Sequence, residues 1–325
     1  MTYKNSLQGR FVGSVTLVIV MFVASLLLWG AGALLGICSA TPTLLSAAGF
    51  DYVGDFVARF LSLLALLSAA LVLNHIHLFE RRVHWLSPLF IWVASVLMFI
   101  HVDYISSLSV LLLVLSLAQL FTCVQETGQE RAIFGAFAVL SFSSLFLLQF
   151  ICLLPLFVLY LFMARVSRAR NLLAALLGAV TPWWLLLGLY YVFPSLEILL
   201  LPARVCYEIL ITAASLSFSL PLLVVTGMEL LVMVVAVGCF AVSSSPAKPL
   251  LRRRLLFIML LNIYLMVLSF LLPQDYLLLL MWRLPGVAVM LSYTLSMRVT
   301  RISNLYFIFL NIVWLSIAII CLWIG

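Results

Sequence analysis

Charged residues are scarce in this sequence. Only 8% of its 325 residues are Asp, Glu, Lys or Arg, while 66% are hydrophobic and the mean hydropathy is +1.31. A soluble protein of this length cannot bury so much apolar surface. No polar stretch exceeds roughly a dozen residues, so there is no room for a soluble domain beside the apolar segments.

Motifs of common enzyme classes are also absent from the sequence. We find no glycine-rich nucleotide loop, no metal-ligand run and no nucleophile elbow. The six cysteines have no paired spacing and the four histidines share no ligand spacing, which argues against a disulfide framework and a zinc site. No repeat of fixed period is visible. Function must therefore be argued from where the few charges fall relative to a bilayer.

The sequence is instead rich in apolar runs of about 18 to 25 residues, each long enough as a helix to cross a hydrocarbon core about 30 Å thick. They predict an all-α, polytopic membrane helix bundle with about eleven transmembrane helices. We expect a seven-helix membrane core in residues 1–192, and an outer interfacial segment followed by four helices in residues 193–325. The predicted helices lie near residues 11–37, 56–79, 85–102, 104–123, 132–147, 149–164, 171–192, 219–242, 255–272, 276–297 and 303–324.

Basic residues predict the orientation of the chain. The net charge of +7 comes from short clusters between the apolar runs, which is a topology signal and not a nucleic-acid surface. Lys and Arg accumulate in cytoplasmic loops. With the N-terminus inside and the C-terminus outside, fourteen of the 17 basic residues are inside, and only Arg59, Arg204 and Arg283 lie towards the outside. The arginines at 252–254 are interpreted as a topology anchor. We expect an integral protein of the bacterial inner membrane without a nucleic-acid partner.

Residues 132–164 are long enough for one tilted helix or for two short ones. A single helix would place the three arginines within residues 165–170 on the side opposite to Arg131. Two helices of about 16 residues that turn near Gln149 keep all four arginines inside, although such short helices must thin the bilayer or sit inside the bundle. We therefore predict a hairpin.

Acidic residues gather in the predicted outer loops. Asp51 and Asp55 close the first loop and Asp103 lies in the second. Carboxylates can hold a hard divalent cation or act as a general base, while outward arginines such as Arg59 and Arg204 can clamp phosphate in a bidentate fork. The plain alternative is that these are headgroup-level charges, with Asp55 and Arg59 paired at i, i+4.

Glu229 is the one acid near the middle of a predicted helix, where a charge is costly and a partner is expected. By depth, Asn262 and Arg283 are its best candidate partners. Arg283 lies about seven residues, or roughly 10 Å, inside its helix. Pro285 and Gly286 follow it, and we expect the proline to kink and break the helix and to free carbonyl groups beside the arginine. The alternatives are an arginine that snorkels to the headgroups and a structural glutamate that is protonated or hydrogen-bonded.

One ordered set of features covers the first seven predicted helices. An acid follows the first helix, a second acid follows the third, and glycine and proline occur in the predicted hairpin and after it, the residues being Asp51 or Asp55, Asp103, Gly135, Pro155 and Gly178. This order resembles that of the membrane-embedded glycosyltransferases of the GT-C superfold. The chain is also similar in texture to small polytopic membrane proteins of Bacteroidota.

The resemblance to GT-C enzymes implies transfer of a sugar from a polyprenyl-phosphate donor at the outer face. Asp51 or Asp55 would then be the base or the ligand of a divalent cation, and Arg283 a phosphate clamp. Two other classes stay in view. Glu229 and Arg283 are typical of a transporter or flippase for a lipid or small anion. The absence of a complete motif suits a non-catalytic membrane subunit of a cell-envelope assembly, with membrane lipids and a membrane protein as partners.

Overall fold

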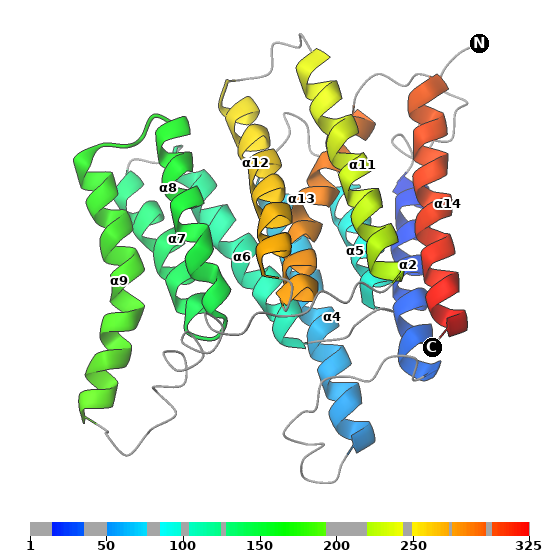
Figure 1. Ribbon diagram of the computed structural model, residues 1–325, viewed down its shortest axis with the longest axis horizontal. Helices are drawn as coiled ribbons and strands as arrows, with labels where there is room; N and C mark the ends of the chain where they lie inside the picture. Colours follow the sequence, from blue (N-terminus) through cyan, green and yellow to red (C-terminus); the bar gives the residue numbers. More distant parts are fainter. Residues whose placement is uncertain are drawn as a thin grey trace. The chain divides into compact units, whose positions relative to one another are not determined.

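The computed structural model describes residues 15–35, 51–76, 85–98, 104–124, 128–192, 220–242, 249–272, 275–296 and 301–324. They form eleven α-helices and one 3-10 helix, and no strand occurs within these ranges. Apolar segments become helices because each backbone N–H and C=O then finds its partner inside the segment, without water. The elements are α2 (Val15–Leu35), α4 (Asp51–His75), α5 (Leu86–Met98), α6 (Tyr104–Thr122), α7 (Gln129–Ser144), η2 (Leu148–Leu153), α8 (Leu154–Met163), α9 (Ala169–Val192), α11 (Leu220–Val242), α12 (Pro249–Leu271), α13 (Tyr276–Ser296) and α14 (Arg301–Ile324) (Figure 1).

The all-α prediction is confirmed, and each of the eleven predicted apolar segments overlaps one α-helix. Five helical stretches in the described part of the chain are long and apolar enough to cross a membrane, and these lie in α4, α6, α9, α12 and α13. The number of crossings and the orientation stay predictions. The predicted interfacial segment after residue 192 lies outside the described residues.

Contacts divide the chain into two units. Unit 1 comprises Met1–Val110, Leu216–Lys248 and Ile258–Gly325, and unit 2 comprises Leu111–Ser215 and Pro249–Phe257. The division passes through α6 and α12, so each unit contains part of both helices. Each unit also contains residues from both sides of position 192, the boundary predicted from the sequence.

In unit 1, α13 is the central helix. It packs against α5, α11 and α14, and α5 in turn contacts α2 and α4. Every residue of α13 except Leu277 and Ser296 is buried. The helix itself carries leucine, methionine, valine and aromatic residues on all sides, which is the pattern of a core helix and not of one with a polar face.

Two contacts show that α11 and α13 run parallel. Glu229 meets Arg283, and further along both helices the ring of Phe240 lies 6.3 Å from the ring of Tyr293. The two contacts are about ten residues apart on each helix and follow in the same direction. Parallel neighbours are expected where one intervening helix, here α12, returns the chain to its starting side.

In unit 2, the hairpin prediction for residues 132–164 is confirmed. Helix α7 ends at Ser144, Leu147 has an extended backbone with φ of −135°, and η2 and α8 follow. The ring centroids of Phe137 and Phe157 are 6.0 Å apart, although a continuous helix would separate these residues by about 30 Å. The chain therefore reverses between α7 and α8 (Figure 1).

Helices α7 and α9 approach each other closely at Gly178. A side chain at that position would meet the Phe134 carbonyl oxygen at 2.5 Å, so only glycine fits without movement of the backbone. Two hydrogen bonds flank the glycine. Ser141 donates to the Ala179 carbonyl at 2.5 Å, and the Trp183 indole donates to the Ser144 hydroxyl at 3.1 Å.

Candidate functional site

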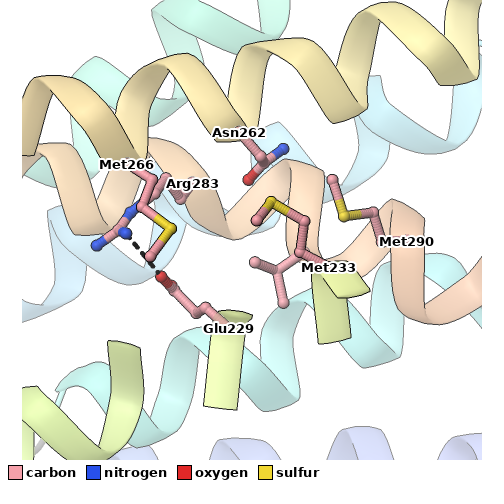
Figure 2. A pocket seen from close by; sticks show the side chains of 7 residues that line it. Glu229, Met233, Asn262, Met266, Arg283 and Met290 are labelled. Carbon is pink, nitrogen blue, oxygen red and sulfur yellow. Dashed lines mark ion pairs between the residues drawn. The ribbon is translucent and has the colours of Figure 1, made fainter. Parts of the chain in front are cut away.

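Three polar side chains, one each from α11, α12 and α13, line a cavity inside unit 1. Glu229 comes from α11, Asn262 from α12 and Arg283 from α13, and all three line one small cavity. Their exposed fractions are 5%, 4% and 2%. Figure 2 shows the Glu229 and Arg283 side chains pointing toward each other, with Met266 beside them. We call Glu229, Asn262 and Arg283 the polar triad.

The polar triad contains a buried ion pair. Arg283 Nη1 lies 3.2 Å from Glu229 Oε2. The ion pair is one close contact between charged groups, and no described group hydrogen-bonds to either carboxylate oxygen of Glu229 or to Arg283 Nε and Nη2. The Nε and Nη2 atoms of Arg283 therefore remain for another acceptor.

A second link between α11 and α13 lies beside the ion pair. The Tyr276 and Thr226 hydroxyls are hydrogen-bonded to each other. The Arg283 guanidinium lies 5.7 Å from the centroid of the Tyr276 ring, within the range of a cation–π contact. Tyr276 therefore helps to position Arg283 while it ties the two helices together.

Asn262 reaches the triad because α13 carries a glycine opposite it. A Cβ atom on Gly286 would overlap the Asn262 side chain. The Asn262 amide donates to the Ile258 carbonyl of its own helix at 2.9 Å, and its Oδ1 atom accepts no hydrogen bond from any described group. The preceding Pro285 has no N–H, so the Met281 carbonyl lacks its usual helical donor.

The expected break of the helix at Pro285 does not occur, whereas the expected kink stays a prediction. Helix α13 continues without interruption from Tyr276 to Ser296 with the proline inside it. Contacts of the buried helix on all sides hold it together, and they outweigh the loss of one backbone bond. Arg283 also does not snorkel, since only 2% of it is exposed and it is paired with Glu229.

The cavity beside the triad is small and its wall is adaptable. Its volume is about 10 Å³, enough for about one water molecule. Besides the triad it is lined by Val287 and three methionines, Met233, Met266 and Met290, which Figure 2 shows around the polar groups. Methionine has three rotatable bonds, so this wall can reshape around a larger guest at low cost.

The structure brings together three of the residues singled out in the sequence, Glu229, Asn262 and Arg283. Asp51 and Asp55 lie in the first two turns of α4, but their side chains lie outside the described part of the structure. Asp103 and Arg204 also lie outside the described residues. Arg59 is 6% exposed on α4.

The divalent cation predicted with these acids stays a prediction. Within the described ranges, no three His, Cys, Asp or Glu side chains form a metal-binding group.

The arginine run at 252–254 has a structural role that the sequence interpretation missed. In unit 2, Arg254 is 3% exposed and donates from Nη2 to the Phe121 carbonyl at 2.5 Å, at the end of α6. Arg253 donates to the Ala164 carbonyl at 3.2 Å, at the end of α8. Cations are stabilising at helix C-termini, where carbonyl groups lack partners. Successive residues of a helix point in directions about 100° apart. In a run of three arginines, one side chain must therefore face the neighbouring helices.

No protein-family model matches the chain, and searches of curated proteins and of solved structures find no match to it.

Proposed function

We propose that the protein is an integral protein of the bacterial inner membrane that moves a small anion, or the phosphate of a lipid, through the polar triad. Arg283 is the anion-binding group, and Glu229 is the counter-ion that holds it when the anion is absent. The observation that carries the proposal is the ion pair, which is buried in unit 1 and leaves the Nε and Nη2 atoms of the arginine without a hydrogen-bond partner among the described groups.

The energetics of the pair favour a functional role over a structural one. Removing two charges from water costs several kcal/mol per ion, and replacement of a buried pair by apolar residues is often neutral or stabilising by about 1–4 kcal/mol. A pair kept only for stability would have most of its hydrogen-bonding groups satisfied. Here the contact is a single one at 3.2 Å, and the groups left over face a cavity.

The arrangement suits exchange between two acceptors. A phosphate or carboxylate can accept from Nε and Nη2 of Arg283 in a bidentate fork, which a lysine cannot offer. The cavity of about 10 Å³ is too small for such an anion, so the methionines must rearrange as it enters.

The test is uptake of inorganic phosphate into proteoliposomes that contain the purified chain. Arg283→Lys keeps the charge and removes the fork, and we expect at least a tenfold loss of uptake, the size of about 1.4 kcal/mol in binding. Arg252→Lys is the matched control, since Arg252 belongs to unit 2 and is not among the residues that line the triad cavity.

A double variant separates the functional role from the structural one. Glu229→Met with Arg283→Met removes both charges at similar volume, and we expect it to fold and to transport nothing. If it transports phosphate as the parent chain does, the pair is structural and the proposal is wrong.

The glycosyltransferase remains a second proposal, supported by one feature of α4. Asp51, Asp55 and Arg59 are four residues apart along this helix and so share one face. Two aspartates and an arginine at this spacing suit a metal-bound or base-assisted reaction on a polyprenyl-phosphate sugar. Asp51→Asn and Asp55→Asn should abolish sugar transfer without loss of the folded protein, while Asp275→Asn, in a later outer loop, should not. Unchanged turnover in both α4 variants would refute this proposal.

A further inference from the structure

Four side-chain hydrogen bonds gather five helix ends at one face of unit 2. Arg254 and Arg253 of α12 bond to the ends of α6 and α8, as described above. Asn171, near the start of α9, donates to the Val166 carbonyl at 2.6 Å, just after α8. It also donates to the Gln129 side chain at 3.3 Å, which begins α7. The ends of α6 and α8 and the starts of α7, α9 and α12 therefore lie together.

This face carries a cluster of arginines that we call the arginine face. The cluster has six members, of which Arg253 is half-buried and the other five are exposed. Glu130 is the only acidic residue in the described part of unit 2, so the face is strongly positive. The members of the arginine face are Arg131, Arg165, Arg168, Arg170, Arg252 and Arg253.

Local structure disfavours arginine at several of these positions. Arg165 has φ of 61°, a left-handed conformation that favours glycine. It follows the end of α8, where the Val166 N–H bonds to the Leu161 carbonyl and the Arg165 N–H to the Phe162 carbonyl. These two bonds define a Schellman motif, in which this position is usually glycine. Arg168 and Arg170 flank the start of α9, where the helix dipole repels cations and no acid occurs in the first turn.

An apolar strip continues from the arginine face along α9. Leu173 and Leu177 follow Arg170 at i+3 and i+7, so the three residues share one helix face. The exposed fractions of the two leucines are 59% and 50%. An arginine above a strip of exposed leucines matches a phosphate headgroup above an acyl chain.

We propose that the arginine face and the adjacent strip of α9 bind an anionic phospholipid selectively. Guanidinium groups hold the headgroup phosphate through bidentate hydrogen bonds, and the acyl chain lies along Leu173 and Leu177. A topology signal alone requires only that a loop carry positive charge during insertion. Lysine or arginine at any position of the loop provides that charge. The occupation of unfavourable positions by arginine points to a role in the folded protein. This site lies in unit 2 and is independent of the polar triad.

The test uses the purified full-length chain in a neutral detergent. Bound lipid is counted by native mass spectrometry, and the midpoint of thermal unfolding is followed during titration with phosphatidylglycerol or phosphatidylcholine. We expect phosphatidylglycerol to bind and to raise the midpoint, and phosphatidylcholine to do neither. Arg168→Gln with Arg170→Gln should weaken phosphatidylglycerol binding about 25-fold, since each basic residue contributes about a fivefold factor. Thr122→Ala, an exposed neutral position at the end of α6, is the control and should bind normally.

Arg165→Gly gives a signature that a purely structural arginine would not. It relieves the left-handed backbone, so the midpoint without lipid should rise, while phosphatidylglycerol affinity should fall about fivefold. This variant keeps Arg168 and Arg170 and with them the charge that sets orientation.

Three results would overturn the proposal. Equal binding of phosphatidylcholine would show that the face does not select anionic lipid. An equal rise of the midpoint with inorganic phosphate would show that the acyl chain is not part of the ligand. Unchanged phosphatidylglycerol affinity in the Arg168→Gln, Arg170→Gln variant would leave these arginines with a role in insertion only.

Discussion

Replacement of Gly178 by alanine tests the packing of unit 2 most directly. The added Cβ would lie 2.5 Å from the Phe134 carbonyl oxygen and 3.0 Å from the Phe137 Cβ. An ordinary contact begins near 3.4 Å, so the two backbones would have to separate by about 0.9 Å. The obstacle is backbone, which cannot turn away as a side-chain end can.

The expected loss of stability follows from three contributions. Overpacking of a well-packed interface costs about 1–3 kcal/mol. The two flanking hydrogen bonds, from Ser141 and Trp183, lengthen as the helices separate, and each contributes about 0.6 kcal/mol in membrane proteins. Alanine gains up to about 1 kcal/mol over glycine in a helix. The net destabilisation of Gly178→Ala is therefore about 1–3 kcal/mol.

The assay is reversible unfolding of the purified chain in detergent, with two glycine controls. A Cβ on Gly188, also in α9, would meet nothing within 4 Å, so Gly188→Ala should be neutral or slightly stabilising. A Cβ on Gly135 would meet only the Gln119 side chain, which can rotate away, so the effect of Gly135→Ala should be intermediate. If Gly178→Ala is as stable as Gly188→Ala, α7 and α9 do not pack backbone to backbone and the reasoning is refuted.

Three further substitutions test other contacts. Arg254→Leu should destabilise the chain by about 2–4 kcal/mol in the same unfolding assay, because the Phe121 carbonyl loses its donor. Asn171→Ala should cost about 1–3 kcal/mol by leaving the buried Val166 carbonyl unsatisfied, and protease cleavage after α8 should become faster. Gly286→Ala should displace Asn262 from the triad and lower stability, and Asn262→Ala in the same chain should restore part of the loss.

The sequence alone was enough to locate the helices. Eleven apolar segments predicted from length and hydropathy each overlap an α-helix, because a segment without polar side chains satisfies its backbone only within itself. Charge distribution also predicted the reversal near Gln149, since only a hairpin keeps Arg131 and Arg165 on one side. The pairing of Glu229 with Arg283 was among the expected partnerships because both lie at depths where an unpaired charge is costly.

Only the tertiary structure decided which helix faces meet. An apolar helix such as α12 has almost no polar face in its sequence, so nothing local indicates that Arg254 turns inward to the end of α6 while Arg252 is exposed. Nor does the local sequence indicate that residue 178 must be glycine, because that requirement comes from α7, which packs against it. Helices form from interactions between near neighbours in the chain. Their packing depends on the shapes of segments that are distant in the sequence, so it becomes visible only when the fold brings those segments together.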